Sequence, residues 1–335
     1  MDMSPARLSS SRRVHFMALS LLVATMVALS FWPHQTWVNR VIVVVLVIMG
    51  ARGVATTTDS GHLERSRVED PVLSLLGALG AVVLARALGV APILAATLTG
   101  LVGGLCVRWA KGARDYHGAP IYAGAFVGIT SRLVFHNVWW VLVSGLLVGI
   151  LWSVSRDAWV GVGGKMGTMS LIAIVGVSLV ARAFHQRGPG APALDAHGYV
   201  GLAFVVGASA APLTFYLAHF RRWGAVLGSS APTATFALVI ALTPTSWAVH
   251  ADVLPYLWYG SSFVGMTTPA RLMRPALSLP LAGLLFTWLA LRFGTFFSGM
   301  GGTAGLTALV SVFALRGAQS TIAQRDAPSS SGGLN

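Results

Sequence analysis

The sequence predicts an all-α polytopic membrane protein with about 12 transmembrane helices: two N-terminal helices, then an inverted 5+5 helix repeat. Three features predict this fold: an apolar composition, a series of apolar segments with short loops, and motifs that occur twice in the same order. Of the 335 residues, 55% are hydrophobic and only 10% are charged. Soluble domains carry about 25% charged residues, so this chain lacks the polar surface that a soluble protein needs.

The apolar segments approach the length of a bilayer crossing, which takes about 20 residues. Lys and Arg gather in the loops of one side, which explains much of the net charge of +13. The positive-inside rule then places both termini in the cytoplasm, and we expect a bacterial cytoplasmic (inner) membrane. The predicted helices span 15–31, 38–52, 72–88, 91–108, 119–135, 137–153, 164–182, 198–218, 224–243, 254–269, 276–292 and 301–316.

Two turn-rich, polar stretches divide the chain, one before residue 72 and one around residue 190. The part between the two stretches and the part after the second one each contain five predicted helices. The predicted organisation is therefore a tail with two peripheral transmembrane helices (1–71), repeat 1 (72–184), a linker (185–197), repeat 2 (198–318, inverted) and a disordered tail (319–335).

The repeat is predicted from three pairs of similar stretches. "YAGAFVGITS" begins at Tyr122 and "YGSSFVGMTT" at Tyr259, while "GVGGKMGT" begins at Gly161 and "GMGGTAGL" at Gly299. A weaker pair matches Ala91-Pro92 with Ala231-Pro232. Since five is odd, the second copy must cross the membrane in the opposite sense. Inverted repeats of this kind are typical of transporters and some channels, with the substrate site near the midplane between the repeats.

The first motif pair supplies the candidate site at this midplane. A glycine lets a solute or another backbone approach closely, hydroxyls can bind a polar solute, phenylalanines can line a narrow passage, and Arg132 can contact an anion. We expect Gly128 and Gly265 to meet near the axis; the alternative is that these glycines only permit tight helix packing. The candidates are Tyr122, Phe126, Gly128, Thr130, Ser131, Arg132, Tyr259, Phe263, Gly265, Thr267 and Thr268.

The glycine-rich turns add a second set of candidates, because each opens a predicted helix. The unpaired N–H groups at a helix start attract an anion or a carbonyl oxygen. Lys165 would add a positive charge in the first copy only; its alternative role is an anchor at the cytoplasmic surface. The candidates here are Gly163, Gly164, Lys165, Thr168, Gly301, Gly302 and Thr303.

All Asp and Glu residues fall in predicted loops or tails, which argues against a cation substrate because a buried cation needs a counter-charge. The sequence therefore favours a channel or transporter for a small anion or a polar neutral solute. We expect no cofactor, no metal and no nucleic acid. The expected partners are the lipid bilayer and the solute, and a homo-oligomer remains open.

Two other functions remain open. The helices could form a scaffold or assembly factor that transports nothing. A lipid-modifying enzyme is the other alternative, with "RDYHG" at Arg114–Gly118 and Asp157 as its polar cluster. One Asp and one His without paired carboxylates or metal-ligand spacing make a weak active site, so we expect no enzyme.

Overall fold

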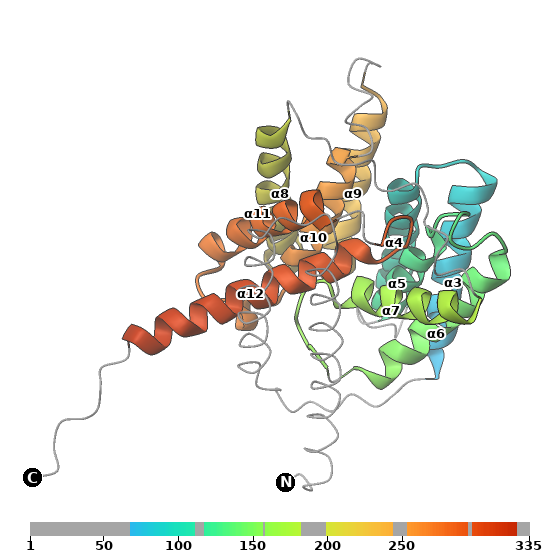
Figure 1. Ribbon diagram of the computed structural model, residues 1–335, viewed down its shortest axis with the longest axis horizontal. Coiled ribbons are helices and arrows are strands. Elements are labelled where there is room, and N and C mark those ends of the chain that lie inside the picture. The colour runs from blue at the N-terminus through green and yellow to red at the C-terminus, as the bar shows by residue number, and fades with distance from the viewer. Residues whose placement is uncertain are drawn as a thin grey trace, which may run out of the picture.

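The computed structural model describes residues 68–110, 117–156, 158–181, 199–243, 253–293 and 297–326, and every regular element in these ranges is a helix. The helices predicted at 15–31 and 38–52 and the linker at 185–197 lie outside the described residues. The described helices form two groups of five, which lie side by side in Figure 1.

The first group contains α3 to α7. Helix α3 is extended by a π-helical turn, η1. Non-helical connections precede α6 and α7. The elements are α3 (Glu69–Val82), η1 (Val83–Ala87), α4 (Pro92–Trp109), α5 (Gly118–Gly128), α6 (Val138–Val154) and α7 (Lys165–Val180).

The second group contains α8 to α12 and has the same order of long and short helices. Helix α8 is also extended by a π-helical turn, η3. The elements are α8 (Val200–Phe215), η3 (Tyr216–Phe220), α9 (Ala225–Ala241), α10 (Val253–Gly265), a short 3₁₀ helix (Pro269–Arg271), α11 (Pro275–Phe293) and α12 (Thr303–Asp326).

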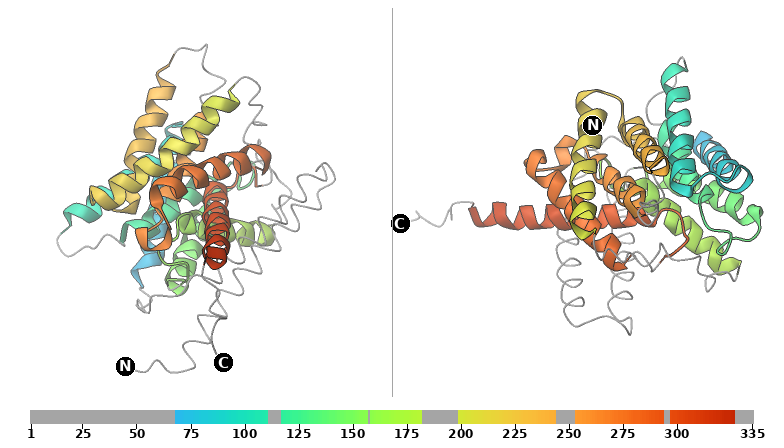
Figure 2. Two further views of the ribbon diagram at one scale, coloured as in Figure 1. Left: turned by 90° about the vertical axis from the view of Figure 1, so that its left-hand side faces the viewer. Right: turned by 90° about the horizontal axis from the view of Figure 1, so that it is seen from above.

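Equivalent helices pack in equivalent ways. In the first group α3 packs on α5 and α6, and in the second group α8 packs on α10 and α11. The groups meet where α4 packs on α9 and where α7 packs on α12. The far end of α12 projects away from the rest of the protein, as the views in Figure 2 show.

Four helical segments are long and apolar enough to cross a membrane: Glu69–Ala87, Pro92–Trp109, Val200–Phe220 and Pro275–Phe293. The helices Val138–Val154, Lys165–Val180 and Ala225–Ala241 are apolar but shorter. Such a set of apolar helices is that of an integral membrane protein. Helices α5 and α10, with 11 and 13 residues, fall well short of a full crossing.

Each of the ten segments predicted between residues 72 and 316 coincides with a helix. Their ends differ most from prediction in three places. Helices α5 and α10 end at Gly128 and Gly265, earlier than the predicted 135 and 269. Helix α12 continues to Asp326, so residues 319–326 of the predicted tail are helical.

The match of Ala91-Pro92 with Ala231-Pro232 was misleading. Pro92 opens α4, where its missing N–H leaves no hydrogen bond unmade. Pro232 lies inside α9, which begins seven positions earlier at Ala225. The two prolines therefore occupy different places in their helices.

Candidate functional site

The short helices α5 and α10 bring four aromatic rings together where the two groups meet. Tyr122 and Phe126 project from α5, one helical turn apart, and Tyr259 and Phe263 from α10 in the same register. All four side chains are buried. The ring centroids are 5.1 Å apart for Phe126 and Phe263, 5.6 Å for Phe126 and Tyr259, and 6.1 Å for Tyr122 and Phe263. We call these four residues the aromatic cluster.

Both tyrosines of the aromatic cluster have buried hydroxyls: that of Tyr259 makes no hydrogen bond within the described part of the chain, and that of Tyr122 has only the Ser229 hydroxyl beside it. A buried hydroxyl without a partner costs about 1–3 kcal/mol. Tyr122 lies close to Ser229 of α9, and the Ser229 hydroxyl is 2.7 Å from that of Ser262 on α10. Polar groups therefore border the rings on the side of α9.

Two residues after the end of each short helix, a threonine binds the glycine-rich turn of the other group. The Thr267 hydroxyl accepts a hydrogen bond from the Gly163 N–H at 3.0 Å. The Thr130 hydroxyl accepts one from the Gly301 N–H at 3.3 Å. The next residues repeat the exchange through the backbone, from Thr268 N to Gly161 O at 2.9 Å and from Ser131 N to Gly299 O at 2.7 Å. Two N–H groups that were predicted to attract an anion are thus occupied by protein oxygens.

The turns also need glycine for steric reasons. A Cβ at Gly163 or Gly301 would collide with the carbonyl oxygen of Phe263 or Phe126, respectively. Gly164 and Gly302, with φ of 87° and 89°, adopt the left-handed conformation that favours glycine and lie directly before α7 and α12. The two copies of the turn therefore share both their conformation and their close contacts.

A side chain from each π-helical turn reaches the same threonines. Arg86 Nη2 donates to the carbonyl oxygen of Thr130 at 2.8 Å. His219 Nε2 lies 3.1 Å from the carbonyl oxygen of Thr267, a hydrogen bond in the tautomer protonated at Nε2. Comparing the two repeats in sequence did not reveal that Arg86 and His219 are equivalent, because arginine and histidine are different residues.

The side-chain positions of Gly128 and Gly265 point to helices of their own group, not to each other. A Cβ at Gly128 would meet Ala78 and Ala81 of α3, and one at Gly265 would meet Ala211 and Thr214 of α8. The alternative role of tight helix packing therefore describes these glycines. The aromatic rings and the threonines of the motif are the residues that contact the other group.

The remaining candidates serve the local structure. Arg132 is exposed and donates to the carbonyl oxygen of Arg86 at 2.6 Å. The hydroxyls of Thr168 and Thr303 bond backbone carbonyls near the starts of their helices, at Gly164 (3.0 Å) and Met300 (2.9 Å).

Lys165 is neither at the surface nor directed into a solute site. It is buried, and Nζ donates to the carbonyl oxygens of Ser155 at 2.6 Å and Arg156 at 3.1 Å. The ammonium also lies 4.8 Å from the centroid of the Trp152 ring. Carbonyls at a helix end are a favourable place for a cation, so Lys165 stabilises the connection from α6 to α7.

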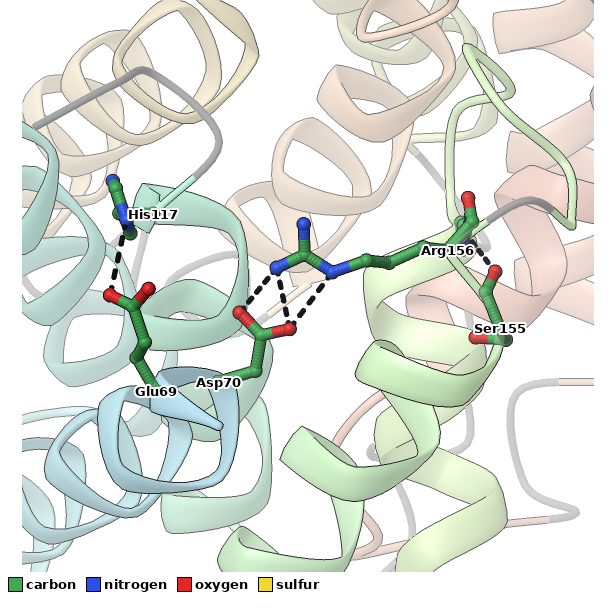
Figure 3. Close-up of polar contacts among 6 residues, drawn as sticks. Glu69, Asp70, His117, Ser155 and Arg156 are labelled. Carbon is green, nitrogen blue, oxygen red and sulfur yellow. Dashed lines mark hydrogen bonds and ion pairs between the residues drawn. The ribbon is translucent and has the colours of Figure 1, made fainter. Parts of the chain in front are cut away.

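A buried ion pair lies beside this connection and corrects the prediction that every carboxylate is in a loop. Asp70 is in the first turn of α3 and fully buried. Both of its oxygens lie 2.6 Å from Arg156 Nη2, and Nε adds a contact of 3.0 Å (Figure 3). Nearby, Glu69 is 3.5 Å from His117. No sequence signal links Asp70 to Arg156, because the pair depends on how α3 and α6 pack.

Among the described residues, no group of three or more His, Cys, Asp or Glu could hold a metal ion. Most of "RDYHG" and Asp157, the polar cluster of the enzyme alternative, lie outside the described residues. Comparison with protein-family models, curated proteins and solved structures found no match.

Proposed function

We propose that the chain is a membrane transporter or channel for a small solute, built as an inverted repeat of 72–184 and 198–318. The solute site lies near the bilayer midplane, at the aromatic cluster between the two repeats. The observation that carries the proposal is the reciprocal exchange in which each short helix binds the glycine-rich turn of the other group.

The inversion is supported by the number of helices and by the shared contacts. Each repeat has five helices in the described part, with a π-helical turn and a short third helix at equivalent places. Two copies with an odd number of crossings enter a membrane from opposite sides, and the count is odd when each short helix and the connection after it make one crossing together. A reciprocal exchange of contacts is what a two-fold axis between the copies would generate.

The depth of the site is supported by the lengths of α5 and α10. At 1.5 Å per residue they are about 17 and 20 Å long, against a hydrocarbon thickness of about 30 Å. Gly128 packs beside Ala78 and Ala81, near the middle of the segment Glu69–Ala87. Helices that stop half-way are typical of transport proteins, where they bring backbone and polar groups to a solute.

The presence of a solute is supported by the two buried tyrosine hydroxyls, of which that of Tyr259 has no partner among the described residues. Lipid offers no hydrogen bonds, so buried polar groups in a membrane protein must be satisfied by protein, water or ligand. A scaffold would place purely apolar side chains between the repeats, whereas this interface has tyrosines and serines.

Flux into liposomes tests the proposal. Purified protein should accelerate the entry of at least one member of a panel of small anions and polar neutral solutes, relative to protein-free liposomes. Phe126→Trp should slow it by filling the interface, and Val205→Ala, at a position 64% exposed on α8, is the control. No acceleration by any solute would overturn the proposal in favour of a scaffold.

Labelling tests the inversion separately. Leu88 and Arg221 are exposed, and each directly follows the π-helical turn of its group. In a Cys106→Ser background, Leu88→Cys and Arg221→Cys should react with an impermeant thiol reagent from opposite faces of the membrane. Reaction from the same face would contradict the inverted repeat.

A further inference from the structure

We infer that the aromatic cluster binds a small uncharged solute that donates and accepts hydrogen bonds, such as a short amide or a polyol. The inference rests on the proposed function and narrows its solute, which the sequence left between an anion and a neutral molecule. It depends on the charges, hydroxyls and rings at the junction of α5 and α10.

The first step is that the helices around the cluster are neutral. Helices α5, α8, α9 and α10 contain no Asp, Glu, Lys or Arg. An ion that leaves water for a buried site needs an opposite charge to offset its lost hydration. A chloride or carboxylate ion would find no such charge on these four helices.

The second step is that the nearby cations are engaged with protein oxygens. Lys165 binds the carbonyls of Ser155 and Arg156. Arg86 donates to Thr130 O, and Arg132 donates to Arg86 O. An anion at the cluster would compete with these charge-assisted hydrogen bonds, which are among the stronger ones in proteins. Of these three side chains, only Arg86 has a buried donor, Nε, without a partner among the described residues.

The third step is that the cluster offers neutral donors and acceptors. The Tyr122 and Tyr259 side chains are fully or almost fully buried; the Tyr259 hydroxyl is unpaired within the described residues, and the Tyr122 hydroxyl has only that of Ser229 beside it. A phenol both donates and accepts, and either hydroxyl of the Ser229–Ser262 pair can be the donor. This set suits an amide or an alcohol better than it suits an ion.

The fourth step is size. The rings of Phe126 and Phe263, with centroids 5.1 Å apart, are in contact and leave no room between them. A solute must separate the rings to pass, and a small solute requires the smallest separation. Flat rings on both sides also favour a compact or planar molecule over a long chain.

The experiment measures the entry of acetamide, glycerol, chloride and formate into the same liposomes. Wild-type protein should accelerate acetamide or glycerol and leave both anions at the protein-free rate. Tyr122→Phe and Tyr259→Phe keep the rings and remove only the hydroxyls, so the double variant should lower the neutral flux about tenfold without lowering thermal stability. Tyr216→Phe, at a position 49% exposed on η3, is the matched control.

The outcomes separate this inference from the proposed function. Flux of an anion without flux of either neutral solute would overturn the inference and leave the transporter in place. Neutral flux that is unchanged in the double variant would overturn the assignment of the hydroxyls. Lack of any flux would overturn the proposed function itself. The panel on wild-type protein decides the solute class even if a variant fails to fold.

Discussion

At the junction of α5 and α10 the two groups contribute equivalent residues, whereas at the ends of their helices they differ. Phe126 and Phe263 share one environment, as do the turns at Gly163 and Gly301. In contrast, the first group contains the buried Asp70–Arg156 pair and Lys165, and the second has Thr303 at the position of Lys165. The shared part is the surface where each group contacts the other. The two copies are also alike at Gly128 and Gly265, which pack on helices of their own group.

The largest expected loss of stability comes from removing the buried ion pair, which only the first group contains. Asp70→Asn leaves the buried Arg156 without a counter-charge and should lower the free energy of unfolding by about 3–5 kcal/mol. Thermal unfolding in detergent measures it. Glu69→Gln is the matched control, because the Glu69 side chain is 59% exposed and should contribute less than about 1 kcal/mol. A loss no greater than that of the control would mean that the pair is not buried as described.

The second effect tests the shared part directly. Gly163→Ala and Gly301→Ala each place a Cβ against a carbonyl oxygen of the other group. Both should destabilise the protein by about 1–3 kcal/mol, and by similar amounts. Gly176→Ala and Gly201→Ala, where a Cβ meets nothing within 4 Å, should be neutral or stabilising by up to about 1 kcal/mol. Strongly unequal losses at the first pair would contradict the equivalence of the two turns.

A smaller effect on stability is expected from removing either of the two equivalent hydrogen bonds between a threonine hydroxyl and a glycine N–H. Thr267→Val and Thr130→Val keep the shape of the side chain and remove the acceptor of a glycine N–H, at about 1–2 kcal/mol each. Thr267→Val should cost more, since its bond is 3.0 Å and that of Thr130 is 3.3 Å. Chemical unfolding in detergent gives the difference, with the exposed Thr235→Val as control. The reverse order would mean that these hydroxyls contribute little through hydrogen bonding.

The smallest effect concerns the π-helical turns. His219→Ala removes the contact with the Thr267 carbonyl and should cost about 1 kcal/mol. His219→Arg should recover most of it, because arginine makes the equivalent contact at Arg86. Melting temperatures of the three proteins are sufficient to compare them. An arginine variant as unstable as the alanine variant would show that the two turns are not interchangeable.

Much of the fold was predictable because apolar segments and glycine-rich turns can be recognised directly in a sequence. The ten helices and the correspondence of the turns at Gly161 and Gly299 follow from such local patterns. The aromatic residues of the site were also within reach, since they belong to the duplicated motif. The proline match failed because two residues are too few to fix a register along a helix.

The rest depends on tertiary packing. Asp70 meets Arg156 only because α3 lies against α6, and the Asp70 position reads as the end of a polar loop. Arg86 and His219 occupy equivalent places with different chemistry. The direction in which the two motif glycines face is also set by packing against α3 and α8, and their spacing alone does not reveal it.

The exchange of the two threonine hydroxyls has a consequence for how the chain assembles. Gly163 N–H and Gly301 N–H each find their acceptor only on the other half of the molecule. Synthesised as two separate polypeptides, cut between Ala181 and Tyr199, the halves would each carry a donor and an acceptor that only the counterpart completes. Such fragments should find one another in the bilayer and reconstitute a whole protein.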